Sequence, residues 1–263
     1  MSGINRREFM GRSAGLLLAA GGIKVLAEVK TEQPDSIVGR VFFEGTAPEP
    51  KLIDCRVDWY CHKINKKKPL TADDLLVGKE NGLQNVFVSV KRGLPGDKKW
   101  PVPAKPVILA HVRCMFVPHV FGIMAGQELL VVNTDKTLEN THGLTKRNKP
   151  FNFNQPRKGM KKTLVLTEPE AFKIKCDVHP WESAYCHVME HPYFALTDKE
   201  GKFAIKGLPA GEYELEFRHE KLGVQGRKVT LSAGKAARVE DVRFKPAKRK
   251  RLATTRATTK GSD

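Results

Sequence analysis

The sequence predicts an all-β protein made of two β-sandwiches, and three observations support this fold class. The chain of 263 residues contains 22 glycines and 16 prolines, with 8% aromatic residues, which is typical of a turn-rich protein. Apart from residues 71–76, no stretch of the chain has apolar residues at a helical repeat. About a dozen short runs rich in Val, Ile, Leu and Phe lie between turn-forming residues, which is the pattern of sandwich strands.

The predicted strands follow one another along the chain from residue 37 onward. Each is short, contains β-branched or aromatic residues, and is bounded by glycine, proline, asparagine or aspartate. With 40% hydrophobic residues, the chain can also fill a core, which excludes a wholly disordered protein. In chain order the predicted strands are residues 37–43, 85–91, 106–112, 128–133, 163–167, 172–176, 194–197, 202–206, 212–217, 227–232 and 237–244.

The N-terminal residues 1–27 have the composition of an export signal. Arg6 and Arg7 are followed by Phe9 and by a short apolar core, which resembles the bacterial twin-arginine signal. An ordinary secretory signal with two chance arginines is the alternative. We therefore expect an exported protein of the periplasm or cell envelope, with residues 28–36 as a polar linker.

The C-terminal residues 245–263 form a basic, threonine-rich tail, and the whole chain has a formal net charge of +17. The tail lacks apolar periodicity, so we expect it to be disordered. An exported protein rarely meets nucleic acid, so nucleic-acid binding is not expected. The tail could instead contact an anionic membrane or cell-wall polymer, and the basic surface could attract an acidic envelope redox protein.

Residues 194–244 carry a second recognisable pattern. Residues 197–213 read T-D-x-x-G-x-F-x-I-x-x-L-P-x-G-x-Y, which resembles the carboxypeptidase regulatory-like, or transthyretin-like, sandwich module. The resemblance implies a fold and little about activity, because this module serves as a spacer or sugar-binding unit. We expect a first domain over residues 37–193, although a strand over residues 37–46 could belong to the second module.

Cys176 and His179 are the residues most informative about chemistry. A thiolate and an imidazole three residues apart on a loop between strands can reach one metal ion. The loop C-D-V-H-P-W-E resembles the copper loop C-x-x-H-P-[FW]-M of the cupredoxin family, especially of amicyanin and methylamine-utilisation-type proteins. The family also carries N-x-D followed by H-N-x-H, and this sequence has N-T-D at residues 133–135 and E-N-T-H at residues 139–142. The resemblance implies a cupredoxin-like Greek-key sandwich.

Carboxylates stand at two of the four ligand positions that this resemblance implies. Glu139 takes the place of the first histidine ligand, and Glu182 takes the place of the axial methionine. His142 could replace Glu139 only if the loop were rearranged. With Cys176 and His179, the set suits non-blue copper, zinc or ferrous iron better than blue copper. A site that has lost its metal is the remaining alternative.

The resemblance also implies a disulfide. In related exported proteins, a cysteine ahead of the G-x-x-N-V-F-V strand accompanies another in C-x-x-x-P-H-V, so Cys61 and Cys114 are expected to pair. Such a bond is compatible with an oxidising envelope. Cys55 and Cys186 remain unexplained by the sequence.

The resemblance implies metal-dependent electron transfer in the cell envelope, with copper as the expected cofactor. Cys176 would give the covalent path to the metal, and His179 would present the edge of its ring to a partner protein. The chain is expected not to be an enzyme, since it contains no nucleophile elbow, zinc-protease or P-loop motif. The alternative is a non-redox protein that binds carbohydrate or cell-wall polymer.

Overall fold

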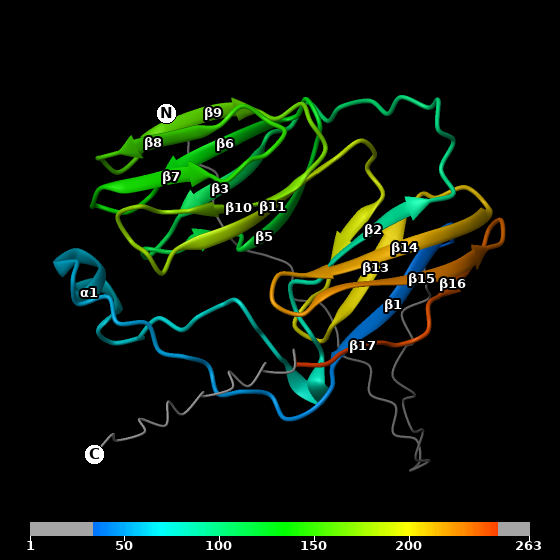
Figure 1. Cartoon of the computed structure of the whole chain (residues 1–263), viewed down its shortest axis with the longest axis horizontal. Coiled ribbons are helices and arrows are strands. Elements are labelled where there is room, and N and C mark those ends of the chain that lie inside the picture. The colour runs from blue at the N-terminus through cyan, green and yellow to red at the C-terminus, as the bar shows by residue number, and fades with distance from the viewer. Residues whose placement is uncertain (1–33, 247–263) are drawn as a thin grey trace, which may run out of the picture. The chain divides into compact units, whose positions relative to one another are not determined.

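A computed structural model of the chain describes residues 34–246, which form two β-sandwiches joined by long loops (Figure 1). The expected export signal lies outside the described residues, as do most of the linker and all but two residues of the tail. Among the described residues, no helix is both long and apolar enough to cross a membrane. The predicted all-β fold class is confirmed.

The first sandwich is formed by residues 107–189. Its strands are β3 (Val107–His111), β4 (Phe116–Val117), β5 (Val120–Met124), β6 (Glu128–Asn133), β7 (Glu139–Gly143), β8 (Phe151–Gln155), β9 (Lys161–Val165), β10 (Ala171–Lys175) and β11 (Ser183–Met189). One sheet has the order β5-β11-β10-β7-β8, and the other has the order β4-β3-β6-β9. The pairs β3–β6 and β5–β11 are parallel, so the chain crosses between the sheets rather than meandering within one.

Alternating side chains build the core of this sandwich. Leu129 and Val131 of β6, together with Phe172 and Ile174 of β10, are buried in one hydrophobic cluster. Because successive side chains of a strand point to opposite faces, these i and i+2 pairs place each strand with one face inward. The same alternation makes the inward face of β3 hold His111 after Leu109, both fully buried.

The second sandwich takes strands from both ends of the chain. Its strands are β1 (Ser36–Phe43), β2 (Phe87–Arg92), β12 (Phe194–Leu196), β13 (Lys202–Lys206), β14 (Gly211–His219), β15 (Gly223–Leu231), β16 (Ala236–Arg238) and β17 (Val242–Phe244). One sheet has the order β12-β2-β14-β15; in the other, β13, β16 and β17 all pair with β1. Strand β1 joins the strands of residues 194–244, which is the alternative stated for residues 37–46, and β2, expected in the first domain, joins them as well. The apolar pattern shows that a segment is a strand but does not name its partner.

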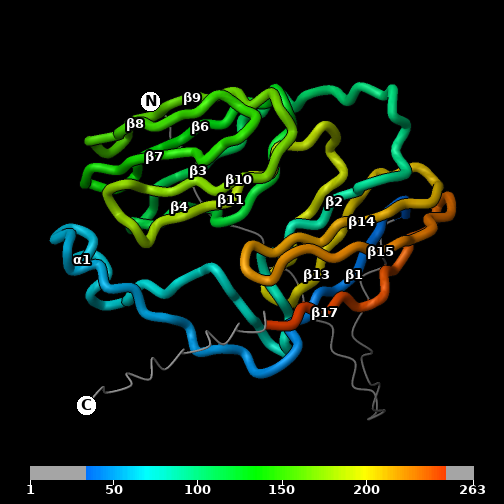
Figure 2. The backbone as a smooth tube through the Cα atoms, in the orientation of Figure 1, coloured from blue at the N-terminus to red at the C-terminus, as the bar shows by residue number. Residues whose placement is uncertain are grey.

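Residues 44–86 connect β1 to β2 and are called here the connecting segment (Figure 2). The segment contains helix α1 (Trp59–Asn65) and the 3-10 turn η1 (Lys79–Asn81). Residues 71–76, which have a helical repeat in the sequence, do not form a helix. Asp58 caps α1, since its Oδ1 accepts a hydrogen bond of 2.7 Å from the Cys61 amide. The Asn65 side chain donates to the carbonyl oxygen of Arg113, which fixes the helix to the first sandwich.

Acid is expected to destabilise the contact between β2 and β11. His187 of β11 stacks on Phe87 of β2, with ring centroids 3.9 Å apart, and burial lowers the pKa of His187 to about 3. The unfolded chain therefore binds a proton that the folded chain excludes between about pH 6.5 and pH 3, and stability falls as pH falls through this window. We expect this histidine alone to cost about 2 kcal/mol between pH 6.5 and pH 5.

Urea unfolding of the purified chain at pH 7 and pH 5 measures this effect. The variant His187→Phe keeps the aromatic stack and should lose less stability on acidification than the wild type, while His62→Phe, at an exposed position, should behave as the wild type does. His219, whose pKa burial lowers to about 4, contributes a loss of the same sign in all three proteins. An equal acid loss in His187→Phe and wild type would contradict the assignment.

Candidate metal centre

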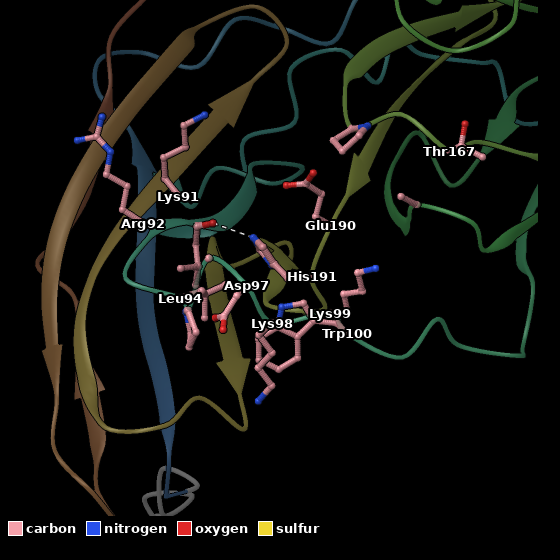
Figure 3. A pocket seen from close by; sticks show the side chains of 15 residues that line it. Lys91, Arg92, Leu94, Asp97, Lys98, Lys99, Trp100, Thr167, Glu190 and His191 are labelled. Atoms are coloured by element: carbon pink, nitrogen blue, oxygen red, sulfur yellow. Dashed lines mark hydrogen bonds between the residues drawn. The ribbon is translucent and has the colours of Figure 1, made fainter.

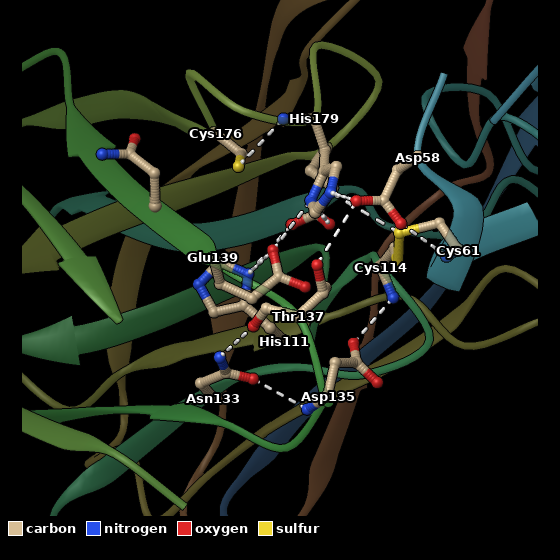
Figure 4. Close-up of polar contacts among 12 residues, drawn as sticks. Asp58, Cys61, His111, Cys114, Asn133, Asp135, Thr137, Glu139, Cys176 and His179 are labelled. Atoms are coloured by element: carbon tan, nitrogen blue, oxygen red, sulfur yellow. Dashed lines mark hydrogen bonds and ion pairs between the residues drawn. A yellow bond between two sulfur atoms is a disulfide. The ribbon is translucent and has the colours of Figure 1, made fainter. Parts of the chain in front are cut away.

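Four buried side chains meet near one end of the first sandwich (Figure 4). His111 ends β3, Glu139 begins β7, and His179 and Glu182 lie on the loop between β10 and β11. The exposed fractions of these four side chains are 0–1%. Two carboxylates and two imidazoles are thus removed from solvent together. The free energy of desolvating them must be offset by hydrogen bonds, ion pairs or a bound metal ion.

The nitrogen and oxygen atoms of these residues converge. Nδ1 of His111 lies 2.9 Å from Oε2 of Glu182 and 3.4 Å from Oε2 of Glu139. Nδ1 of His179 lies 2.9 Å from Oε2 of Glu139 and 3.2 Å from Oε1 of Glu182. Imidazole and carboxylate ligands bind a metal at about 2.0–2.2 Å, which places neighbouring donor atoms about 2.9–3.4 Å apart in octahedral or tetrahedral geometry. These four nitrogen-to-oxygen separations fall in this range, while the four-residue group whose donor atoms all lie within 4.8 Å of one another is Cys114, Glu139, His179 and Glu182.

The outer nitrogen of each ring has its own partner. Nε2 of His111 is 3.0 Å from Oγ1 of Thr141, and Nε2 of His179 is 3.4 Å from Oδ2 of Asp58. When these nitrogens donate their protons outward, both Nδ1 atoms turn a lone pair toward the carboxylates. Metal-binding histidines are commonly oriented in this way by a second hydrogen bond.

The four residues depend on one another for charge compensation. Among the described residues that contact them, there is no lysine or arginine. Burial raises the pKa of Glu139 to about 7. Burial opposes the ionisation of Glu182, but hydrogen bonds from the two imidazoles outweigh it and lower the pKa of Glu182. Burial likewise opposes charging of His179, yet contacts with Cys176 and the two carboxylates raise its pKa to about 12.

Two carboxylate oxygens in this cluster are incompletely satisfied. Oε1 of Glu139 is buried and has no hydrogen-bond partner, and Oε1 of Glu182 is buried with only the ion-pair contact of 3.2 Å to Nδ1 of His179. Leaving a buried charged oxygen without a donor costs about 1–3 kcal/mol or more. A cation between the carboxylates and the two Nδ1 atoms would satisfy these oxygens and balance their charge, so the residues present fit a metal ion.

The loop of residues 176–182 positions the last two of these side chains. The amide of Cys176 donates to the carbonyl oxygen of Glu182, and the amide of Glu182 donates to the carbonyl oxygen of His179. The buried thiol of Cys176 is free, and its Sγ accepts a hydrogen bond of 3.2 Å from the His179 amide. Asn140 Oδ1 accepts from the Asp177 amide, which ties the loop to β7.

A tight turn and a disulfide lie beside the cluster. Arg113 and Cys114 have left-handed φ values of 56° and 59° in the turn between β3 and β4, and the carboxylate of Asp135 accepts a hydrogen bond from each of their amides. Cys114 is joined to Cys61 of α1, with the Cα atoms 5.9 Å apart. Cys61 Sγ lies 3.5 Å from Nε2 of His179.

The structure brings together some of the residues that the sequence singled out. Glu139, His179 and Glu182 meet directly, and Cys176 contacts the backbone of His179. His142 lies elsewhere, partly exposed and hydrogen-bonded to Asp177, because an offset of three residues along β7 places it on the face opposite Glu139.

Sequence reasoning missed His111. Its signal was a histidine at an inward position of an otherwise apolar strand, two residues after buried Leu109. Sequence reasoning also expected the His179 ring to have an exposed edge. The ring is instead buried, covered by Trp181, whose ring centroid lies 5.2 Å away. Trp181 is itself half-buried and donates a hydrogen bond to the carbonyl oxygen of Cys114.

A separate pocket of about 720 Å³ lies among the loop after β2 and the ends of other strands (Figure 3). Basic and aromatic side chains line it, including Lys91, Lys98, Trp100 and His191. Lys98 lies over the Trp100 ring, 4.0 Å from its centroid, and Lys91 is 3.8 Å from a carboxylate oxygen of Glu216. Lys98 and Lys91 are therefore already engaged in contacts within the protein. The described residues that line this pocket do not form a recognisable catalytic group.

Solved structures similar to this chain are copper proteins of cupredoxin fold. Amicyanin from Paracoccus versutus is 18% identical over 39% of this chain and 97% of its own, with a TM-score of 0.30. A purple cupredoxin from Nitrosopumilus maritimus is 20% identical over 32% of this chain and 99% of its own, with a TM-score of 0.27. These likenesses concern the fold alone.

A third similar structure is a copper-containing nitrite reductase from Thermus scotoductus, 21% identical over 38% of this chain, with a TM-score of 0.32. This chain spans only 26% of the length of that enzyme. The expectation that the chain is not an enzyme, which rested on the absence of known catalytic motifs, was wrong, since an enzyme is among the similar structures. No protein-family model matches the chain, and no curated protein matches it.

Proposed function

We propose that this chain is an exported cupredoxin-like protein that binds one metal ion, copper in the first instance, and transfers single electrons in the cell envelope. The observation that carries the proposal is that His111 and His179 each place Nδ1 2.9–3.4 Å from oxygen atoms of both Glu139 and Glu182, with a buried Glu139 oxygen that lacks a hydrogen bond. Two nitrogen and two oxygen donors suit tetragonal Cu(II).

The residues of the chain prepare this site in three ways. Thr141 and Asp58 orient the two imidazoles, as described above. Trp181 and the disulfide cover the site against water. Bound copper would supply one-electron chemistry, and half-buried Trp181, stacked on His179, is the group through which a docked partner would approach the site.

The remaining parts of the proposal concern location and partners. The Cys61–Cys114 disulfide supports an oxidising compartment such as the periplasm. The formal net charge of +17 supports an acidic redox partner, and we propose that the basic tail contacts an anionic membrane or cell-wall polymer. We propose further that the second sandwich is carboxypeptidase regulatory-like and acts as a spacer or sugar-binding unit.

Metal loading of the purified, disulfide-bonded chain tests the function. After dialysis against Cu(II), we expect one copper per chain, weak visible colour, and an electron paramagnetic resonance spectrum of tetragonal nitrogen and oxygen ligation. The colour should be weak because this ligand set contains no thiolate, and intense colour comes from thiolate-to-copper charge transfer. If the chain retains no metal but binds to immobilised polysaccharide, the proposed function is replaced by carbohydrate or cell-wall binding. The candidate site for that function is the pocket of about 720 Å³ that Trp100 lines.

A further inference from the structure

We propose that Cys61 and Cys114, when reduced to thiols, form a second metal site with Nε2 of His179, and that this site binds a thiophilic d10 ion such as zinc. The disulfide state would then determine whether the chain holds one metal ion or two. The inference deepens the proposed function and rests on it in one respect, since Nδ1 of His179 is assigned to the first site.

The positions of the three donor atoms support a thiolate site. Sγ of Cys61, Sγ of Cys114 and a ring nitrogen of His179 all lie within 4.8 Å of one another, and all three residues are buried. The Cys61 Sγ to His179 Nε2 distance is 3.5 Å. In a tetrahedral zinc site, with Zn–S near 2.3 Å and Zn–N near 2.0–2.1 Å, the sulfur and nitrogen atoms are about 3.5 Å apart. The two sulfur atoms would need to separate to the spacing of two zinc ligands.

A fourth ligand would come from Asp58 after its side chain moves toward the sulfur atoms, since Asp58 lies beside the three donors but is not part of the group within 4.8 Å. Oδ2 of Asp58 lies 3.4 Å from Nε2 of His179, and its side chain is 22% exposed, whereas the His179 ring is buried. The other oxygen of Asp58 is held by the Cys61 amide, so the carboxylate and the thiol belong to one short, ordered turn. Asp58 therefore provides both an oxygen ligand and the side of the site that faces solvent.

His179 lies between the two sets of donors. Its Nδ1 faces Glu139 and Glu182, and its Nε2 faces Asp58 and Cys61. Cys114 also groups with Glu139, His179 and Glu182 as possible ligands of one ion. With both sites filled, His179 would act as a bridging imidazolate, so that each site would influence the other through one ring.

The chemistry balances with an external dithiol as the reductant. The disulfide takes up two electrons and two protons and becomes two thiols, while the dithiol is oxidised to its own disulfide. A divalent ion then displaces the two thiol protons and the His179 ring proton to solvent. The ion and the two thiolates carry opposite charges, which compensates their burial.

The test compares zinc binding by the full chain before and after reduction. The chain is treated with a small dithiol, freed of it under anaerobic conditions, and loaded with Zn(II). We expect one more zinc per chain than in the disulfide-bonded protein, with Cys61 and Cys114 protected from alkylation by at least 10-fold. The double variant Cys61→Ser, Cys114→Ser should show no difference between the two treatments, while Cys55→Ser, which removes a buried free cysteine of the same cluster, should behave as the wild type does.

Equal zinc content in the two states, or alkylation of both cysteines at an unchanged rate, would overturn the proposal. If reduction unfolds the chain, circular dichroism decides: refolding by zinc with both thiols protected supports the site, and no refolding rejects it. The variant His111→Ala separates this proposal from the function. If His111→Ala binds zinc only after reduction, the thiolate site is present and the first site is not. If it binds one zinc in both the disulfide-bonded and the reduced state, the first site is present and the thiolate site is not.

Discussion

Replacing His111 with alanine is expected to weaken metal binding by the disulfide-bonded chain by roughly 100-fold or more, because ligand loss should exceed the 10–100-fold typical of outer partners. His111 supplies one of the two Nδ1 atoms that face the carboxylates. Equilibrium dialysis with Cu(II), followed by elemental analysis, measures the loss. His142→Ala is the matched control: this histidine was expected near the metal, but its side chain contacts Asp177 at the surface.

Loss of the His111 ring also leaves Glu182 buried without its hydrogen bond, which endangers folding. The variant His111→Gln keeps a polar side chain next to Glu182 and should be the better folded of the two by circular dichroism. A folded His111→Gln protein that binds copper as tightly as the wild type would contradict the assignment of His111 as a ligand. Equal loss in His142→Ala would contradict the assignment of the site to the buried cluster.

The double variant Glu139→His, Glu182→Met should turn intensely blue when loaded with Cu(II). These changes restore the two residues that the cupredoxin pattern places at those positions, beside Cys176 and His179. Two imidazoles, a thiolate and a weak axial sulfur give strong copper–thiolate bonding and strong visible absorption. Absorption spectroscopy of wild type and variant at equal copper content measures the change.

The triple variant that adds Cys176→Ser should lose the colour while keeping the fold, and this is the control. A colourless double variant that still binds copper would mean that Cys176 keeps its contact with the His179 amide and does not reach the metal. A double variant that binds no copper would mean that the sandwich serves as a scaffold without the expected ligand geometry.

The site differs from a blue-copper centre through a small number of residues that act together. Glu139 and Glu182 each bring a carboxylate into the interior, and each contacts one or both imidazoles. A buried carboxylate is tolerated only with a partner that offsets its desolvation. His111, which no pattern in the sequence connected with Glu182, provides that partner from the opposite sheet.

Local patterns were enough to identify most strands and part of the site. The spacing of Cys176, His179 and Glu182 places all three on one short loop, so their proximity follows from the sequence. The β-type runs correctly predicted an all-β chain, because period-two alternation and turn residues are local properties. Strand β7 was missed, since its polar residues Glu139, Asn140 and Thr141 are buried by partners from other strands.

What the sequence by itself determined is the all-β class and the residues of the loop at 176–182, because both depend on neighbours along the chain. Only the tertiary structure decided that β1 and β2 join the second sandwich, that His111 completes the cluster, and that Cys61 lies 3.5 Å from His179. These facts depend on which strand pairs with which and on where the connecting segment packs. Residues 71 positions apart, such as His111 and Glu182, meet only because β3 and the β10–β11 loop end at the same place in the sandwich.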